Sequence, residues 1–570
     1  MQCISQKFSV ILEVICPTAA PQNIYKGLYY PQLQKKRVVA TSMAFAGVRR
    51  AFQVIDRIGI QSRITSTQIR SIMSLSKTIT FPIIGETYEQ PTGLFINNEY
   101  VKSRSGKTFE VITPITEERI ATLQQAGAED VDYAVECASK AYAKWKFTKP
   151  EIRARILYRA AEIFDEERET LAKIESLDNG KSLDCARFDV NLVIEYLRSC
   201  AGYCDKVDGR TVETGPDHLT YTKREPLGVC GAITPWNFPL LMFSWKVGPS
   251  IATGNTMVIK PASATPLSNL YAAALFKKAG LPAGVLNVIP GSGRNCGNAI
   301  LQHPKIRKVA FTGSTSVGRG IMKGAADTIK KVTLELGGKS PNIVFQDCNV
   351  KQTIQNLITG IFFNGGEVCC AGSRIYIQAT DEKWYNDFLQ QFKEAVEKLK
   401  VGNPFEKGIY QGAQTTPDQF QTVLDYIKIA EKTNLKLLTG GHRIGTKGFF
   451  VEPTVYYDVP QDSQLTQEEI FGPVAVVLPF KSIDELVEKA NDSEYGLGSG
   501  INTTDINKAI YVADRLEAGS VWINTYSDLQ QNAPFGGYKQ SGLGREMGAE
   551  ALDNYTQVKL VRVKLNKPEL

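Results

Sequence analysis

Apolar residues recur at intervals of three and four in two early segments of the chain. Between residues 131 and 145 they are Val, Val, Ala, Tyr and Trp, and between residues 152 and 163 they are Ile, Ile, Ala and Ile. This spacing places each set on one face of an α-helix, and such a face is ordinarily buried in a core. The pattern therefore predicts two amphipathic helices over these segments.

From Gly228 onward the pattern changes to short apolar runs separated by helical segments. The runs are GVCGAI, NTMVIK, GVLNVIP, KVAFTG, KVTLEL and PNIVF. Runs rich in Val and Ile that alternate with helices are typical of a parallel sheet covered on both faces. The pattern predicts an α/β fold with a doubly wound, nucleotide-binding domain, followed beyond about Gly338 by a second α/β unit.

Two further segments alternate between apolar and polar residues and belong to neither core. They are HLTYTKREPLGV, near Tyr221, and YTQVKLVRVKL, near Val558. Exposed strands of this kind often pair with another subunit, so both segments are candidates for an oligomer contact.

Length and composition limit the class of protein. A chain of 570 residues is too long to fold around a single hydrophobic core, so its length predicts two or three domains. With 43% hydrophobic and 22% charged residues it has a globular composition, and no apolar run reaches the roughly 18 residues of a membrane-spanning helix. Eleven cysteines and three histidines, without a repeated C-x-x-C pair, fit neither a disulfide framework nor a zinc finger. We expect a reducing compartment and no metal site.

Positive charge is concentrated at the N-terminus. Residues 1–78 contain 11 Lys or Arg against Glu13 and Asp56, a local charge of +9, whereas the whole chain carries +7. The remainder is slightly acidic, which argues against a nucleic-acid surface. Arginines in a Ser/Thr-rich, acid-poor segment are typical of a mitochondrial transit peptide. The alternative is a basic tail that is not a targeting signal. Met43 is a second candidate start.

Two segments could contact a nucleotide. KVAFTGSTSVGRG (308–320) predicts a strand, a turn at Gly313 and Ser314, and a helix that begins near Gly318. Such a turn lets a phosphate approach the backbone, although the spacing differs from G-x-G-x-x-G and a turn without a ligand is an equal alternative. In MVIKPASATPLSNL, Lys260 ends a strand, where it would meet either a ribose or phosphate or only solvent.

Two segments could supply a base and an oxyanion donor. Glu335 stands between leucines in LELGGKSPN, and apolar surroundings would raise its pKa toward neutrality. In ITPWNFPLLMFSWK, Pro235 and Pro239 bracket Asn237, whose amide could stabilise an oxyanion. The plain alternatives are a solvent-facing glutamate and a structural turn packed on aromatics.

Cys369 and Cys370 are adjacent in FFNGGEVCCAGSR, where backbone geometry opposes a disulfide. Free cysteine is commonly a small buried hydrophobe. The preceding Asn-Gly-Gly loop and the following strand instead favour a nucleophile, whose thiolate needs help from a base or a local field. A thiol, a carboxylate base, an amide donor and a nicotinamide site are together the parts that oxidise an aldehyde through a thioester.

From about Tyr88 to the C-terminus the chain resembles the aldehyde dehydrogenase superfamily, most closely the yeast-type mitochondrial, potassium-activated acetaldehyde dehydrogenases. Six ordered motifs carry the resemblance: PWNFPLLM, FTGSTSVGR, LELGGKSPN, the cysteine loop, EEIFGPV and PFGGYKQSGLGREMG. The resemblance implies oxidation of a small aliphatic aldehyde, such as acetaldehyde, to the acid with NAD or NADP. Betaine or semialdehyde oxidation and a non-catalytic binding relative are the alternatives. A homo-oligomer, dimer or tetramer, in the mitochondrial matrix is also implied, and activation by potassium stays open.

The resemblance assigns roles to individual residues. In the catalytic set Cys369 is the nucleophile, Glu335 the base and Asn237 the oxyanion donor, and Lys246 and Glu546 relay a proton. The positions that contact the cofactor are Trp236, Lys260, Ser263, Gly313, Ser314, Gly318, Glu469 and Phe471. The positions that line the substrate channel are Phe238, Leu241, Met242, Trp245, Val368, Cys370, Leu529 and Phe535.

One residue departs from the family pattern. Relatives that use only NAD commonly carry Glu three positions after the strand-end lysine, and this chain carries Ser263. Serine removes the charge that would repel a 2′-phosphate and leaves Lys260 free to pair with one. We therefore expect NADP to be accepted. Glu335 argues against transfer of the acyl group to coenzyme A, since relatives with that activity generally lack this base.

The family fold also implies domain boundaries. A basic transit segment, expected to be disordered, covers residues 1–80, and a Rossmann-like cofactor domain covers 81–207 and 227–337. An α/β catalytic domain covers 338–554. The oligomerisation strands cover 208–226 and 555–570.

Overall fold

The computed structural model describes residues 75–567, which form a mixed α/β protein with two large sheets and a projecting three-stranded arm. The predicted α/β class is confirmed. The segment 1–74, which holds most of the predicted transit peptide and Met43, lies outside the described residues, as do residues 568–570. The last part of the segment expected to be disordered is instead ordered, because Ser76–Thr80 forms β1 and pairs with β2 (Thr87–Pro91).

The first sheet has eight strands with a parallel centre. Five of the six predicted runs, as β13, β12, β9, β10 and β11, lie next to one another there and run parallel. Antiparallel strands close both edges. In spatial order the strands are β23 (Gly542–Leu543), β13 (Lys331–Glu335), β12 (Ile306–Thr312), β9 (Val229–Ile233), β10 (Thr256–Lys260), β11 (Leu286–Val288), β3 (Leu94–Ile96) and β4 (Glu99–Val101).

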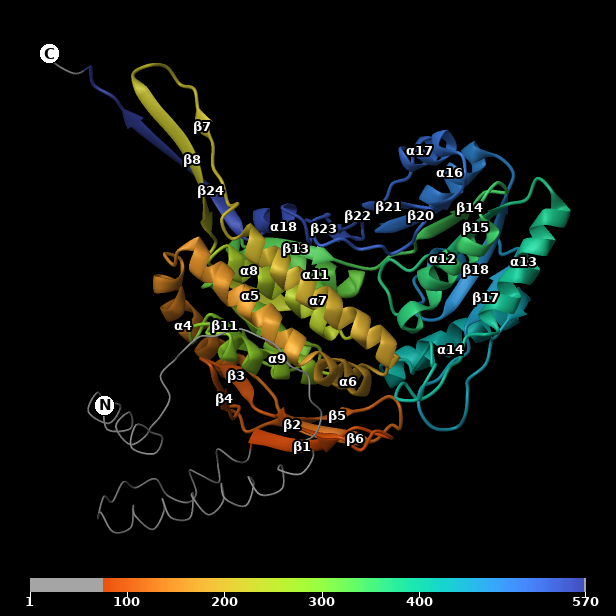
Figure 1. Cartoon of the computed structure of the whole chain (residues 1–570), viewed down its shortest axis with the longest axis horizontal. Coiled ribbons are helices and arrows are strands. Elements are labelled where there is room, and N and C mark those ends of the chain that lie inside the picture. Colours follow the sequence, from red (N-terminus) through yellow and green to blue (C-terminus); the bar gives the residue numbers. More distant parts are fainter. Residues whose placement is uncertain (1–74, 568–570) are drawn as a thin grey trace, which may run out of the picture. The chain divides into compact units, whose positions relative to one another are not determined.

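Helices cover both faces of this sheet. Alternate residues of β10 show why: Val258 packs into one apolar cluster, whereas Met257 and Ile259 pack into the other. The helices on the Val258 side are α4 (Ala128–Trp145), α10 (Asn298–Gln302) and α11 (Thr315–Ala325). Those on the other side, which lie side by side in Figure 1, are α5 (Pro150–Glu166), α6 (Arg168–Asn179), α7 (Leu183–Tyr203), α8 (Pro239–Ala252) and α9 (Leu267–Lys278).

Three sequence predictions about helices can be compared with these bounds. Both amphipathic helices exist, as α4 and α5. The helix predicted to begin near Gly318 is α11, which begins at Thr315 instead. The reason is local: Ser314 has the extended φ and ψ of an N-cap residue, and its main-chain oxygen accepts the Gly318 N–H at 2.9 Å, so the helix begins before the glycine.

The second sheet has seven strands and contains the last predicted run, PNIVF, as β14. In spatial order the strands are β16 (Lys436–Thr439), β17 (Thr454–Tyr457), β18 (Val474–Phe480), β15 (Arg374–Gln378), β14 (Pro341–Val344), β20 (Gly498–Asn502) and β21 (Ser520–Ile523). One face packs on α12 (Val350–Phe362) and α13 (Glu382–Val396). The other face packs on α14 (Pro417–Lys432), α16 (Ile483–Asn491) and α17 (Ile506–Ala513).

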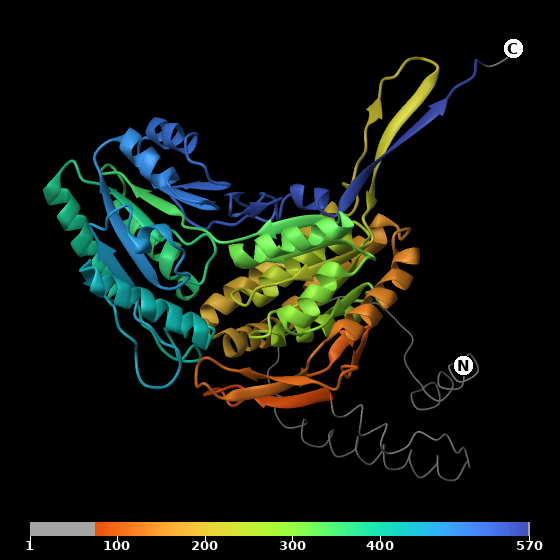
Figure 2. The ribbon, with the colours of Figure 1, turned by 180° about the vertical axis from the view of Figure 1, so that it is seen from behind.

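The two predicted exterior strands form the arm. β8 (His218–Pro226) pairs along its whole length with β24 (Thr556–Lys564), and β7 (Thr211–Val212) pairs with β8. Figures 1 and 2 show the arm projecting away from both sheets.

The remaining short elements are β5 (Thr108–Ile112), β6 (Arg119–Gln124), β19 (Tyr495–Gly496), β22 (Tyr538–Lys539), α15 (Gln464–Gln467), α18 (Glu550–Asp553), η2 (Gly293–Gly297), η3 (Ala326–Thr328) and η4 (Phe363–Gly366). No helix between residues 75 and 567 is long and apolar enough to span a membrane.

Candidate active site

A cavity of about 310 Å³ opens where three neighbouring strands of the first sheet end. Because β9, β12 and β13 are parallel neighbours, their carboxyl ends meet at one edge, the usual place for a ligand in such a sheet. Three further parts complete the wall. They are the residues directly after β13, the loop that carries Cys369, and α14. The lining residues are Pro235, Trp236, Asn237, Phe238, Met242, Thr312, Gly313, Ser314, Glu335, Leu336, Gly337, Cys369, Gln419, Thr422, Glu469, Ile470 and Phe471.

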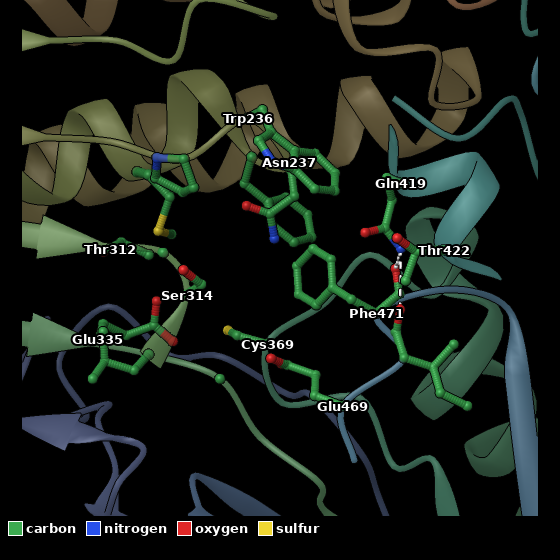
Figure 3. A pocket seen from close by; sticks show the side chains of 17 residues that line it. Trp236, Asn237, Thr312, Ser314, Glu335, Cys369, Gln419, Thr422, Glu469 and Phe471 are labelled. Atoms are coloured by element: carbon green, nitrogen blue, oxygen red, sulfur yellow. Dashed lines mark hydrogen bonds between the residues drawn. The ribbon is translucent and has the colours of Figure 1, made fainter. Parts of the chain in front are cut away.

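The loop that carries Cys369 is bent by consecutive left-handed residues. After α12, residues 364–366 have φ of 51°, 62° and 74°. Gly366 has no room for a side chain, since a Cβ there would overlap the backbone of Gly472. The bend brings Cys369 to the cavity wall (Figure 3), which explains the Asn-Gly-Gly sequence before the two cysteines.

Glu335 ends β13 and faces the same cavity, on the side opposite Trp236 in Figure 3. Its side chain is almost fully buried, with 1% of the residue exposed. Neither carboxylate oxygen has a hydrogen-bond partner among residues 75–567. Burial raises the pKa of this carboxyl to about 7, although the Cys369 thiol and the Lys246 ammonium oppose the rise. A carboxyl with this pKa can exchange protons near neutral pH.

The Cys369 thiol is not activated by a fixed positive charge. The neighbouring Cys370 thiol, burial and the Glu335 carboxylate together raise the pKa of Cys369 well above its usual value. The sequence predicts that a base or a local field assists formation of the Cys369 thiolate. In the structure the assisting group is a base. A thiol in these surroundings must pass its proton to an acceptor as it reacts, and Glu335 is a neighbouring acceptor with a suitable pKa.

Asn237 lies on the turn between β9 and α8, above Cys369 in Figure 3. Its amide Nδ2 donates a hydrogen bond to the Glu367 main-chain oxygen at 2.8 Å, two residues before Cys369 in the chain. An amide nitrogen carries two hydrogens, so one remains for a group in the cavity. The hydrogen bond fixes the amide relative to the nucleophile loop.

Lys246 and Glu546 are brought together from distant parts of the chain. Lys246 Nζ lies 3.1 Å from Glu546 Oε1 and donates to Thr312 Oγ1 at 2.7 Å. Lys246 is fully buried, whereas Thr312 lines the cavity. The Thr312 hydroxyl group therefore lies between this pair and the cavity.

The predicted cofactor positions separate into two groups. Trp236, Gly313, Ser314, Glu469 and Phe471 all line the cavity. The rings of Trp236 and Phe471 meet edge to face with centroids 5.3 Å apart. Glu469 accepts the Gly338 N–H at 2.9 Å, and burial raises the pKa of its carboxyl to about 7.

The other three cofactor positions lie outside the cavity wall. Lys260 Nζ and Ser263 Oγ both donate to the Gly291 carbonyl, at 3.1 and 3.0 Å, and burial lowers the pKa of Lys260. Gly318 is explained by packing, since a Cβ there would come within 2.6 Å of Leu336 as α11 crosses β13.

Two of the eight predicted channel residues, Phe238 and Met242, line the cavity. The other six are not part of the cavity wall and lie in or against the hydrophobic core. Trp245 and Phe535, for example, meet edge to face at 5.6 Å within the core. Buried Leu241 and Cys370 and half-buried Val368 and Leu529 also belong to or pack on this core.

Sequence reasoning missed Gln419 and Thr422 of α14, which line the cavity from the second half of the chain. Gln419 Nε2 donates to the carbonyls of Ile470 and Phe471, at 3.1 and 2.7 Å, and so holds the Phe471 segment. No local motif marks either residue, because α14 reads only as an amphipathic helix. Among residues 75–567 no group of three or more His, Cys, Asp or Glu side chains is placed to hold a metal ion.

Comparisons with known proteins agree with this geometry. The sequence model described as "Aldehyde dehydrogenase family" matches residues 100–561. An aldehyde dehydrogenase of Emericella nidulans is 51% identical over 493 residues, covering 86% of this chain and 98% of the relative. Retinal dehydrogenase 2 of Mus musculus is 46% identical over 479 residues, covering 83% and 92%.

Solved structures give the same result. An NAD+ complex of an aldehyde dehydrogenase from Bacillus cereus superposes with a TM-score of 0.82 at 44% identity, covering 88% of this chain and 99% of that one. A betaine aldehyde dehydrogenase from Staphylococcus aureus in complex with NAD+ has the same TM-score at 36% identity, covering 84% and 96%. The chain is therefore an oxidoreductase that belongs to the aldehyde dehydrogenase family.

Proposed function

We propose that this protein oxidises a small aliphatic aldehyde to the carboxylic acid through a thioester on Cys369. The observation that carries the proposal is the convergence of Cys369, Glu335 and Asn237 on one cavity from three separate segments of the chain. Cys369→Ala should abolish NADH production, whereas Cys348→Ala, which removes another free, buried cysteine, should not. Full turnover by the Cys369 variant would contradict the proposal.

The residues around the cavity fit a nicotinamide dinucleotide. Gly313 and Ser314, at the N-terminus of α11, would hold phosphate oxygens, and the Glu469 carboxylate would accept a hydrogen bond from a ribose hydroxyl. Trp236 and Phe471 offer apolar surface for a planar ring. When bound, the nicotinamide supplies the hydride acceptor that the side chains lack.

The chain's own residues would perform the remaining chemistry. Cys369 sulfur attacks the aldehyde carbon as its proton passes to Glu335. Asn237 Nδ2 and the Cys369 main-chain N–H, which has no acceptor among residues 75–567, donate to the oxygen that becomes negative. After oxidation to the thioester, Glu335 first gives up the proton that it took from Cys369; it then takes a proton from water, which attacks the acyl carbon and releases the acid. Lys246 and Glu546 would carry each of these two protons away from Glu335 through Thr312.

The proposed substrate class follows from the wall beside Cys369. Phe238 and Met242 are apolar, and the carboxyls of Glu335 and Glu469 are the ionisable oxygen groups on the wall. A small aliphatic aldehyde suits these surroundings better than an anionic semialdehyde, which the carboxyls would repel. A panel of acetaldehyde, hexanal, succinic semialdehyde and betaine aldehyde tests this, and a preference for either charged substrate would contradict it.

We also propose that NADP is accepted beside NAD. Ser263 carries no charge to repel a 2′-phosphate, and Lys260 lies beside it on the same Gly291 carbonyl. Ser263→Glu should therefore reduce turnover with NADP far more than with NAD. Absence of NADP turnover in the wild type would refute this proposal.

The proposed assembly is a homo-oligomer, dimer or tetramer, built through the arm. The apolar side chains Val558 and Leu560 of β24 are 65% and 60% exposed, which favours a partner. Light scattering tests the assembly.

A location in the mitochondrial matrix rests on residues 1–78 alone and is tested by cell fractionation with N-terminal sequencing. Activation by potassium is tested by turnover in potassium and in sodium buffers.

A further inference from the structure

A buried ion pair lies directly behind the turn that carries Asn237. Lys181 follows α6 and Asp189 lies on α7, and their side chains are 0% and 1% exposed. Lys181 Nζ donates to Asp189 Oδ2 at 2.6 Å and to the main-chain oxygen of Asn237 at 2.9 Å. The ammonium also lies 4.3 Å from the centroid of the Phe238 ring. Two of these contacts, those to Asn237 and Phe238, hold the Asn237 turn.

The same turn is joined to the nucleophile loop. Two further donors reach the Asn237 main-chain oxygen, Asn364 Nδ2 at 3.1 Å and Asn179 Nδ2 at 3.4 Å. Asn364 belongs to the loop before Cys369, and the Asn237 side chain donates to Glu367 in that loop. The oxyanion donor and the nucleophile are therefore connected by one small network of hydrogen bonds. Lys181 joins the ion pair to this network through the Asn237 main-chain oxygen.

Stability alone is a weak explanation for this ion pair. Burial of two charges costs desolvation energy that offsets most of their attraction, and apolar side chains fill such a space without that cost. A lysine adds a charged donor, which binds a carbonyl oxygen more strongly than a neutral donor does. Although burial opposes the charged form, the Asp189 and Glu175 carboxylates raise the pKa of Lys181 above its ordinary value. A pKa above the ordinary value of lysine keeps this donor charged at neutral pH.

We propose that Lys181, held by Asp189, is a positioning residue that fixes the oxyanion-donating amide of Asn237 against Cys369. Lys181 does not reach the reacting atoms. It holds the main chain from which the amide projects, and a misplacement of about 1 Å near reacting atoms can slow a reaction roughly 100-fold. This inference rests on the proposed role of Asn237.

The test is a double-mutant cycle with acetaldehyde and NAD+ as substrates. Lys181→Met and Asp189→Leu together remove the pair without leaving a buried charge. We expect kcat to fall about 10- to 100-fold, with KM changed less than about threefold. In an Asn237→Ala background the same pair of changes should cost less than about threefold, because the amide that they misplace is already absent. Lys330→Met is the matched control, since Lys330 is also buried and donates to a carbonyl, that of His303 at 3.0 Å, outside the cavity wall.

Each outcome decides between specific explanations. An equal loss with and without Asn237 would overturn the inference, since it would indicate a general packing defect. An unchanged kcat in the pair variant would overturn it as well. If Asn237→Ala alone costs nothing, the proposed oxyanion role fails instead, which is a different result. If the pair variant does not fold by circular dichroism, Asp189→Asn replaces it in the cycle, with a smaller loss expected that again depends on Asn237.

Discussion

The buried carboxyl of Glu335 should destabilise the folded protein as the pH rises. Its pKa is about 7 in the folded chain against 4.5 as the ordinary value. Below pH 4.5 the carboxyl is protonated in both states and has no effect. Between these values only the unfolded state loses the proton, so unfolding becomes easier as the pH rises. The full difference corresponds to about 3 kcal/mol, of which roughly 2.5 kcal/mol falls between pH 5 and pH 8.

Glu335→Gln should remove this dependence, because an amide does not titrate. Urea unfolding of the wild type and the variant at pH 5 and pH 8, followed by tryptophan fluorescence, gives the difference in the free energy of unfolding at each pH. Any pH-independent cost of the amide cancels between the two. Relative to the wild type, the variant should gain about 2.5 kcal/mol at pH 8 compared with pH 5. Glu431→Gln, an exposed change on α14, is the control. Equal differences at both pH values would refute the raised pKa.

Three further predictions concern the surroundings of the site. Gly366→Ala should abolish activity and lower thermal stability because a Cβ overlaps the neighbouring backbone, whereas Gly408→Ala, with a similar φ of 77° but open space, should cost only the ~1–2 kcal/mol of a non-glycine residue in the left-handed region. Glu367→Gln should keep near-normal kcat at pH 7, since burial raises the pKa of that carboxyl to about 8 and the group is mostly uncharged at pH 7; a large loss would show that it acts in its ionised form. Lys246→Met should slow turnover about 10-fold or more and leave Glu546 without its partner, and an unchanged pH profile would contradict a proton role.

The first sheet could be predicted because each of its central strands is a local signal. β9, β10 and β12 carry runs of Val, Ile and Ala that are buried on both faces, and a parallel sheet covered by helices is what such runs require. The start of α11 could not be predicted as well, since neither Ser314 nor Gly318 alone marks the residue at which the helical backbone begins.

The candidate site was predictable where a residue adjoins a strand end. Asn237, Gly313 and Glu335 follow or end neighbouring parallel strands, so the sheet itself brings them together. Gln419 and Lys181 were not predictable, because their importance depends on contacts with segments far away in the chain. Their own surroundings in the sequence indicate only a helix and the end of a helix.

The central claim is that Cys369 carries the acyl group and that Glu335 releases it. Mixing Glu335→Gln with acetaldehyde and NAD+, quenching in acid and mapping peptides by mass spectrometry measures this directly. We predict an acetyl group that accumulates on Cys369, because Glu335→Gln slows release of the acid more than it slows the burst of NADH that forms the thioester. An acetyl group on Cys370, or steady-state turnover at the wild-type rate without any accumulated adduct, would contradict the account.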